Sequence, residues 1–354
     1  MPPPDTGPDA GPAPPVPFLP SGKSLSFSEV STFLQCRRQH FYRYFLRLKS
    51  KVYAENRHML IGSMTHDPIE AVYRDVMSGK TTRAEVTRRD SDIYVEDAAT
   101  AIYREITGPA WKAHFDEDMF RLDQAIAEEM YWVFVEHMLK TEPFEILEPE
   151  ARFETEFGGR HFIGVADQRY LVAPGTFTFG DGGLKRFEVP PGQYIGEFKT
   201  RANSFKKRIR TDATNDLQTE IYVSVFKDAG HDIRGTIRSI LKKPPKDLFE
   251  RDLSMPVQDQ IELVRMYYAN AEPATHFRRE IVPLVIDPRE VESRIAVDVA
   301  AMEAFYANPF GGMVEAPKLY RTGFPCGWCE YLRFCHDGLQ VSRDTSFSYK
   351  KVRE

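Results

Sequence analysis

Two carboxylates and one lysine lie in stretches of the sequence that alternate as β-strands do. Asp167 ends the run 164–167, and a single phenylalanine separates Glu197 from Lys199. Because side chains alternate along a strand, Glu197 and Lys199 share a face, and a neighbouring strand can bring Asp167 beside them. A divalent cation such as Mg²⁺ or Mn²⁺ offsets the repulsion between two carboxylates. The cation also polarises a phosphodiester, and the lysine orients water or stabilises charge on phosphorus. The pattern therefore predicts metal-dependent phosphodiester hydrolysis.

Three further polar residues bear on this interpretation, because a Glu-x-Lys pair alone is also typical of a solvated strand face. His66 precedes Pro68, which a helix tolerates in its first turn, so we expect His66 at a helix entrance. There it is either a metal ligand or an ordinary cap. Gln218 and Tyr222 are four residues apart in a helix expected over 212–226, which places both on one face.

The order of these motifs resembles that of a known nuclease family. The series Gly-Ser-Met-Thr-His over 62–66, Gly-Val-Ala-Asp over 164–167, Glu-Phe-Lys-Thr over 197–200 and Gln-Thr-Glu-Ile-Tyr over 218–222 is similar to the motif set of RecB-like nucleases of the PD-(D/E)xK superfamily. The resemblance implies that His66, Asp167 and Glu197 bind the catalytic Mg²⁺ or Mn²⁺ and that Lys199 is catalytic. It also implies that Gln218 and Tyr222 support the active site and the DNA.

The four cysteines of the chain form one remote residue and one cluster. Cys36 stands about 290 residues before the group Cys326, Cys329 and Cys335. Three thiols within ten residues can converge on one metal centre, and Cys36 would complete four ligands. Zinc is the main alternative, although structural zinc sites usually combine two close pairs. His336, next to Cys335, is a candidate substitute ligand of this centre.

The same spacing resembles the iron-sulfur nucleases of this superfamily, namely the CRISPR-associated nuclease family and the nuclease domain of AddB-type helicase subunits. The resemblance implies a structural [4Fe-4S] cluster held by all four cysteines. A link between residues 36 and 326 would close a very long loop and thereby remove unfolded-state entropy.

The pattern along the chain predicts one α/β nuclease domain over 25–340. Residues 1–24 form a proline-rich arm that we expect to be disordered, and a first helix over 25–50 begins with the capping pair Ser26 and Glu29 and carries Cys36. A helical region over 78–140 precedes a catalytic core over 144–241. The core consists of a hairpin turning at 158–159, a loop over 173–192, a strand over 193–200, a helix over 212–226 and a strand over 233–241. Helices over 257–270 and 288–306, a cluster-binding segment over 320–337 and a polar tail over 341–354 follow.

The expected fold is therefore a restriction-endonuclease-like mixed central sheet flanked by helices, with a helical region before the catalytic strands and a C-terminal iron-sulfur cap. The net charge of -5 and pI near 6.1 exclude binding to nucleic acid through overall positive charge. DNA contact must then come from a local basic patch, for which the candidates directly follow the Glu-x-Lys strand: Arg201, Lys206, Lys207, Arg208 and Arg210.

The chain has no apolar run long enough to span a membrane and no signal-peptide pattern, so we expect a cytoplasmic protein. The resemblance implies an exonuclease acting on single-stranded DNA or DNA ends. Its setting would be recombination, repair, phage DNA processing or CRISPR adaptation, with a helicase or another protein of these systems as a partner. Two alternatives stay open: a non-catalytic DNA-binding or complex-forming subunit with this fold, and a nuclease stabilised by zinc.

Overall fold

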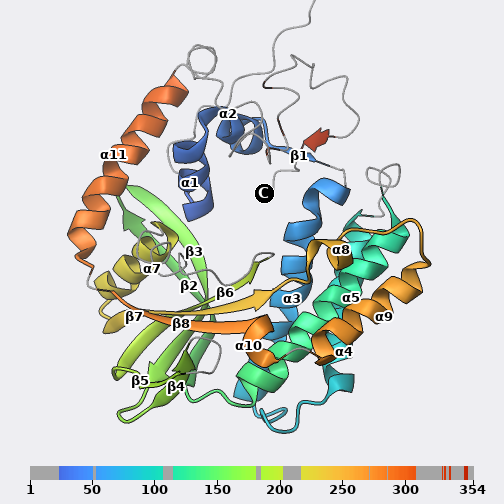
Figure 1. The fold of residues 1–354 in the computed structure, drawn as a ribbon. Helices are drawn as coiled ribbons and strands as arrows, with labels where there is room; N and C mark the ends of the chain where they lie inside the picture. The colour runs from blue at the N-terminus through green and yellow to red at the C-terminus, as the bar shows by residue number, and fades with distance from the viewer. Residues whose placement is uncertain are drawn as a thin grey trace, which may run out of the picture.

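A five-stranded mixed sheet forms the centre of the molecule (Figure 1). The computed structural model describes residues 24–50, 53–106, 115–180, 185–201, 217–270, 272–284, 286–307, 329, 331, 335 and 347–349. The strand order is β2-β3-β6-β7-β8, and only the β6–β7 pair is parallel. The bounds are β2 (Glu145–Phe157), β3 (Arg160–Val172), β6 (Gly192–Arg201), β7 (Ile233–Lys242) and β8 (Phe277–Pro283). A mixed sheet flanked by helices was expected and is confirmed, whereas β8 was not anticipated.

The β2–β3 hairpin brings the Asp167 strand to the centre of the sheet. Gly158 and Gly159 form its turn at φ 61° and 75°, a left-handed conformation that residues with a Cβ rarely adopt. β3 then pairs with β6 from Gln168↔Gly196 onward, so the Asp167 and Glu197 strands are neighbours, as expected. The loop expected over 173–192 instead contains the antiparallel strands β4 (Phe177–Gly180) and β5 (Lys185–Glu188). Its alternating Thr and Phe residues favour strand pairing, a signal that the surrounding glycines and prolines obscure.

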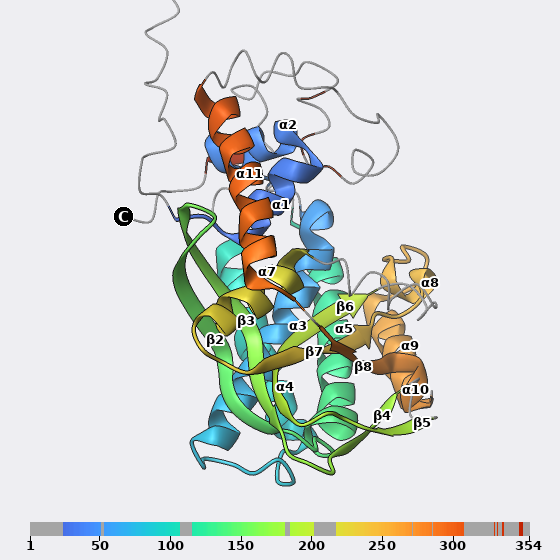
Figure 2. The same cartoon turned by 90° about the vertical axis from the view of Figure 1, so that its left-hand side faces the viewer.

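Helices cover both faces of the sheet, as Figures 1 and 2 show. One face packs against α3 (Tyr53–Met77), α4 (Arg88–Ile106), α5 (Glu117–Phe134) with its π-helical continuation η3 (Val135–Leu139), and α9 (Val257–Asn270). The other packs against α1 (Phe27–Gln35), α7 (Leu217–Asp228) and α11 (Pro288–Ala307). Of the two short helices, α8 (Lys246–Phe249) contacts α5 and α9, and α10 (Pro273–His276) contacts the edge strand β8. Within the described ranges no helix is long and apolar enough to cross a membrane.

Helix α3 begins much earlier than Pro68 led us to expect. It starts at Tyr53 and runs through Pro68 to Met77, so His66 lies within the helix and not at its entrance. A proline inside a helix removes one backbone hydrogen bond. Burial of one apolar face of α3 offsets this loss, and the buried residues on both sides of the proline are Ile61, Met64, Ile69, Val72 and Tyr73.

The first helix expected over 25–50 is interrupted at Cys36. Ser26 caps α1 as expected, since its side chain accepts a hydrogen bond from the amide of Glu29 at 3.3 Å. Cys36 then adopts an extended conformation, and its thiol accepts a hydrogen bond from the Gln39 amide at 3.5 Å. A new helix α2 (Arg37–His40) and a π-helical turn η1 (Phe41–Phe45) follow. The prediction of one continuous helix was wrong because the cysteine acts as a cap.

A two-stranded sheet joins segments from the two ends of the chain. β1 (Leu48–Ser50) pairs antiparallel with β9 (Phe347–Tyr349), so the tail expected over 341–354 contains a strand. Other expectations concern residues outside the described part: nearly all of the arm over 1–24, and the segment 320–337 apart from Cys329, Tyr331 and Cys335.

Candidate functional site

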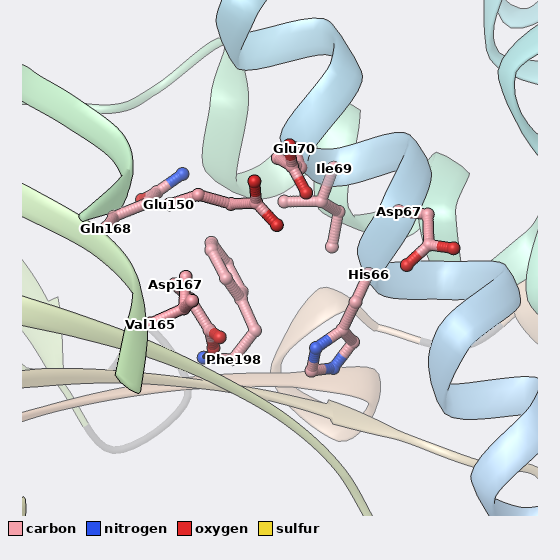
Figure 3. Close-up of a pocket in the computed structure, with 9 residues that line it drawn as sticks. All are labelled: His66, Asp67, Ile69, Glu70, Glu150, Val165, Asp167, Gln168 and Phe198. Carbon is pink, nitrogen blue, oxygen red and sulfur yellow. Dashed lines mark hydrogen bonds between the residues drawn. The ribbon is translucent and has the colours of Figure 1, made fainter. Parts of the chain in front are cut away.

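A pocket with a volume of about 200 Å³ lies between α3 and the strands β2, β3 and β6 (Figure 3). Helix α3 contributes one imidazole and two carboxylates, and the strands contribute two more carboxylates and an amide. The lining residues are His66, Asp67, Ile69, Glu70, Glu150, Val165, Asp167, Gln168 and Phe198. Two of the residues predicted from the sequence to hold a metal, His66 and Asp167, therefore face the same pocket.

Asp167 is held in place by the neighbouring strand. Its Oδ2 accepts a hydrogen bond of 2.6 Å from the backbone amide of Phe198, the residue between Glu197 and Lys199. Burial raises the pKa of the Asp167 carboxyl, and the nearby charge of Glu150 acts in the same direction. The hydrogen bond from Phe198 and the charge of Lys199 oppose that increase. A bound cation would remove the cost of keeping this carboxylate charged.

Glu197 and Lys199 share one face of β6, as strand alternation predicts. Lys199 Nζ lies 2.7 Å from Glu197 Oε1, and Arg238 Nε lies 2.9 Å from Glu197 Oε2. The Glu197 side chain is buried, and Arg238 stands opposite it in the register between β6 and β7. Glu197 thus lies between two cationic groups and does not line the pocket that contains His66 and Asp167.

The predicted partners on the following helix meet Lys199. Lys199 Nζ donates to Gln218 Oε1 at 3.3 Å, and Gln218 Nε2 donates to the Tyr222 hydroxyl at 3.2 Å. Gln218 and Tyr222 lie one helical turn apart on α7, so their side chains are on one face of the helix. The chain of hydrogen bonds fixes the direction of the lysine side chain.

His66 approaches the sheet from α3. Its ring makes an edge contact with Phe198, with 6.2 Å between ring centroids. The pKa of His66 is lowered to about 4, mainly by burial. The positive charges of Lys199 and Lys243 also lower this pKa, whereas the negative charge of Glu197 raises it. The imidazole is therefore neutral at pH 7, which is the state that a metal ligand requires.

Residues 24–176 match the family model of the PD-(D/E)XK nuclease superfamily. The match includes α3 with His66 and the β2–β3 hairpin with Asp167, and it ends before β6. It suggests a metal-dependent nuclease. No curated protein matches the chain.

The motif-based prediction missed four polar residues of the pocket. Glu70 lies four positions after His66 on α3, and this helical spacing was available as a signal. Asp67 directly follows His66. It was missed because Pro68 predicted a helix start at this point, whereas α3 begins earlier, at Tyr53. Glu150 and Gln168 reach the pocket only through the register of β2 and β3, which the sequence alone does not specify.

Within the described residues, no three His, Cys, Asp or Glu side chains are close enough to form a metal-binding group. The three predicted ligands, His66, Asp167 and Glu197, thus do not converge on one point in this structure. The Glu197 carboxylate instead pairs with Lys199 and Arg238. The pocket nevertheless suits a hard divalent cation, since carboxylate oxygens are its preferred ligands. Burial raises the pKa of Asp67, and repulsion from the nearby charge of Glu150 raises this pKa as well.

Three of the four cysteines gather around Tyr42. Cys36 and Cys335 are buried, and Cys335 lies in the apolar cluster that contains Tyr42, against which Cys329 also packs. The pKa of Tyr42 is raised to about 12, first by burial and then by charge on Cys335, Cys329 and Cys36, while the charge of Arg38 lowers it. The remote Cys36 and two C-terminal cysteines, Cys329 and Cys335, therefore lie near Tyr42. Cys326 and His336 are outside the described residues.

The structure places one residue of the predicted DNA-binding run. Arg201 ends β6, two residues after Lys199, and its backbone oxygen accepts a hydrogen bond from the Lys243 amide at 2.7 Å. Lys206, Lys207, Arg208 and Arg210 lie outside the described residues. Their contact with DNA remains a prediction.

Proposed function

We propose that the chain is an exonuclease that hydrolyses phosphodiester bonds in single-stranded DNA or at DNA ends, with Mg²⁺ or Mn²⁺. The main support is the arrangement around Lys199, whose charge acts on both Asp167 and His66. Lys199 and Asp167 come from adjacent strands and His66 from the helix opposite, and the family match contains both Asp167 and His66. Recombination, repair, phage DNA processing and CRISPR adaptation are settings for such an activity.

In this proposal His66 and Asp167 hold the cation, and Glu197 joins them when its carboxylate leaves Arg238. When bound there, a cation would supply charge stabilisation at the phosphoryl group and would make the attacking water more acidic. Lys199, directed by Gln218 and Tyr222, orients the attacking water and stabilises negative charge on phosphorus. Arg201 and the basic run that follows it bind the phosphate backbone.

A second candidate is a non-catalytic DNA-binding or complex-forming subunit. One observation favours it, namely that Glu197 is paired with both Lys199 and Arg238 and lies outside the pocket.

A cleavage assay separates the two candidates. The purified chain is incubated with end-labelled linear DNA, single- or double-stranded, and with circular DNA, in Mn²⁺, Mg²⁺ or EDTA. We expect metal-dependent loss of the linear strands while the circles stay intact. Nicked circles would indicate an endonuclease, and DNA binding with no cleavage in either metal would support the non-catalytic subunit.

We further propose that Cys36, Cys326, Cys329 and Cys335 hold a [4Fe-4S] cluster that ties the first helices to the C-terminal segment. The support is the position of the three described cysteines around Tyr42. Tyr331 adds a direct tie, because its hydroxyl donates to the Leu48 carbonyl at 2.8 Å. A cluster at this place would have mainly a structural role.

Replacement of Cys329 by alanine is expected to abolish visible iron-sulfur absorption and to lower the soluble yield, because three thiolates hold a cluster less well than four. Tyr331→Phe is the matched control, since it removes the hydroxyl that donates to the Leu48 carbonyl and leaves every thiol in place, so the visible absorption should be kept. Iron and zinc are measured in anaerobically purified protein. A colourless wild type that contains zinc would refute the iron-sulfur proposal and support a zinc-stabilised nuclease.

A further inference from the structure

His58 presents a flat ring on α3, two helical turns before His66. Its imidazole stacks on Phe249 of α8, with 4.7 Å between the ring centroids and 11° between the ring planes. The residue is nevertheless exposed, so Phe249 covers one ring face and the other face is open to a ligand. Eight residues of an α-helix advance by about 12 Å, so this ring lies outside the candidate pocket but close to it.

The neighbours of His58 hold the ring in one orientation. Lys243 Nζ donates to His58 Nδ1 at 3.2 Å and to the His58 carbonyl oxygen at 3.0 Å. Arg57 fixes the ring beneath, because its guanidinium lies over Phe249 at 4.4 Å from the centroid and donates to the Phe249 carbonyl at 2.7 Å. Asp123 in turn accepts hydrogen bonds from Arg57 Nε at 2.8 and 3.0 Å. A ring that is already ordered loses little entropy when a ligand stacks on it.

The ring is neutral, whereas the lysine beside it is charged. The pKa of His58 is lowered to about 4, first by burial and then by the charges of Lys243 and Arg57. The pKa of Lys243 is lowered to about 8, mainly by burial, so its ammonium keeps most of its charge at pH 7. A flat neutral ring beside a fixed positive charge suits a ligand that combines flat rings with negative charge, as a nucleotide does.

A stripe of exposed and half-buried positions on α3 connects this ring to the pocket. Gly62 lies in the middle of the stripe, where a Cβ would be 3.7 Å from Thr200 Oγ1, so the helix passes close to the residue that follows Lys199. The stripe ends at His66, which lines the pocket. Its members recur every three or four residues and therefore share one helix face: His58, Met59, Gly62, Ser63 and His66.

The ends of β6 and β7 add positive charge beside the ring. Arg201 is the register partner of Lys242, and the Arg201 carbonyl accepts a hydrogen bond from the Lys243 amide at 2.7 Å. Arg201 and Lys242 are both partly exposed. Three cationic residues at one place attract the phosphates of a nucleic acid.

We propose that His58 is a stacking platform for one base of single-stranded DNA, about three to four nucleotides from the bond that is cleaved. Every base has a flat π-face, so such a platform binds DNA without regard to sequence. Bases in a duplex stack on one another, so the platform favours single strands. This inference rests on the proposed nuclease function and adds the path of the substrate, which runs along the N-terminal half of α3.

Fluorescence anisotropy of labelled oligonucleotides in EDTA tests the proposal, because the full chain then binds DNA without metal-dependent cleavage. The probes are an oligothymidylate of about twelve nucleotides, within the usual range of single-strand site sizes, and an abasic strand of equal length. We expect His58→Ala to raise the dissociation constant for oligothymidylate by at least about fivefold. The abasic strand has phosphates and no bases, so the same variant should bind it as the wild type does. His58→Tyr keeps a ring and should restore binding of oligothymidylate.

His137→Ala is the matched control, because His137 is a half-buried imidazole on η3 that does not line the pocket. It should bind both probes as the wild type does. Melting temperatures are measured for all variants. If His58→Ala weakens the binding of both probes equally, the ring has only a structural role and the proposal is wrong. Unchanged binding of oligothymidylate would overturn it as well.

Three outcomes separate the platform from the nuclease function on which it rests. If the wild type cleaves DNA and His58→Ala binds oligothymidylate equally well, the platform fails and the nuclease proposal stands. If His58 is needed for base-dependent binding but no metal supports cleavage, the platform stands and the chain is a non-catalytic DNA-binding subunit. If the wild type neither binds nor cleaves DNA, both proposals fail.

Discussion

Replacement of Asp167 by asparagine is expected to lower metal-dependent DNA cleavage by at least about 10³-fold. A coordinated cation supplies several kcal/mol of charge stabilisation in the transition state, and about 1.4 kcal/mol corresponds to a factor of ten in rate. Asparagine keeps an oxygen that can accept the hydrogen bond from the Phe198 amide, so the β3–β6 contact should survive. Only the negative charge is lost.

The same variant should keep its stability in the absence of metal. Burial already raises the pKa of Asp167, which means that the folded protein disfavours the charged carboxylate. A neutral amide avoids this cost, so the melting temperature in EDTA should equal or exceed that of the wild type. Added Mn²⁺ should stabilise the wild type and leave the variant unchanged, because a ligand stabilises only the state that binds it.

Asp232→Asn serves as the control, since Asp232 is exposed and its nearest cation is Arg234 at 2.8 Å. It should retain full cleavage and the full response to Mn²⁺. Both variants are purified in parallel with the wild type, which also reveals any contaminating nuclease. Cleavage by Asp167→Asn at a rate within tenfold of the wild type would exclude Asp167 from the catalytic centre.

Loss of Arg279 is expected to cause the largest fall in stability. Arg279 Nη1 and Nη2 lie 2.9 and 2.7 Å from the two carboxylate oxygens of Glu142, and both side chains are buried. Arg279→Leu would leave the Glu142 carboxylate buried without its cation, a change that costs roughly 3–5 kcal/mol. With an unfolding entropy of roughly 2.1 cal/mol/K per residue, the melting temperature of this chain of 354 residues should fall by roughly 4–7 °C.

The double variant Arg279→Leu, Glu142→Leu separates pairing from packing. Because apolar residues can replace a buried ion pair at little cost, it should recover most of the lost stability. Lys246→Met at the exposed Lys246–Glu250 pair is the control and should change stability by less than about 1 kcal/mol. Denaturant unfolding gives all four values. Equal losses in the single and double Arg279 variants would show that packing alone accounts for the effect.

The sequence predicted the parts of the fold that rest on local patterns. The β2–β3 hairpin followed from alternating residues around two glycines, and α9 and α11 followed from helical periodicity. Pro68 misled the prediction because the burial of α3 outweighs one missing hydrogen bond. The prediction of one continuous first helix was wrong because Cys36 caps α1 and α2 in an extended backbone conformation, which helical periodicity does not reveal.

The candidate site was predictable in its parts and not in its assembly. Strand alternation placed Glu197 beside Lys199, and helical spacing placed Gln218 beside Tyr222. Arg238 was missed because its contact with Glu197 depends on the parallel register of β6 and β7, which joins residues 41 positions apart. Glu150 was missed for the same reason, since only the pairing of two strands brings it opposite Asp167.

The tie between the first helices and the C-terminal segment has a consequence for the order of folding. The apolar cluster around Phe33, Phe41 and Tyr42 is completed by residues of α11 and by Tyr331 and Cys335. Contacts across such long separations form slowly, because a large loop must close first. During synthesis, the helical layer of α3 to α5 can pack as soon as it emerges from the ribosome. The segment 25–48 can pack on β2, β3 and α7 once these have been made, but its apolar cluster is complete only after about 335 residues, and chaperone binding would be most useful before that point.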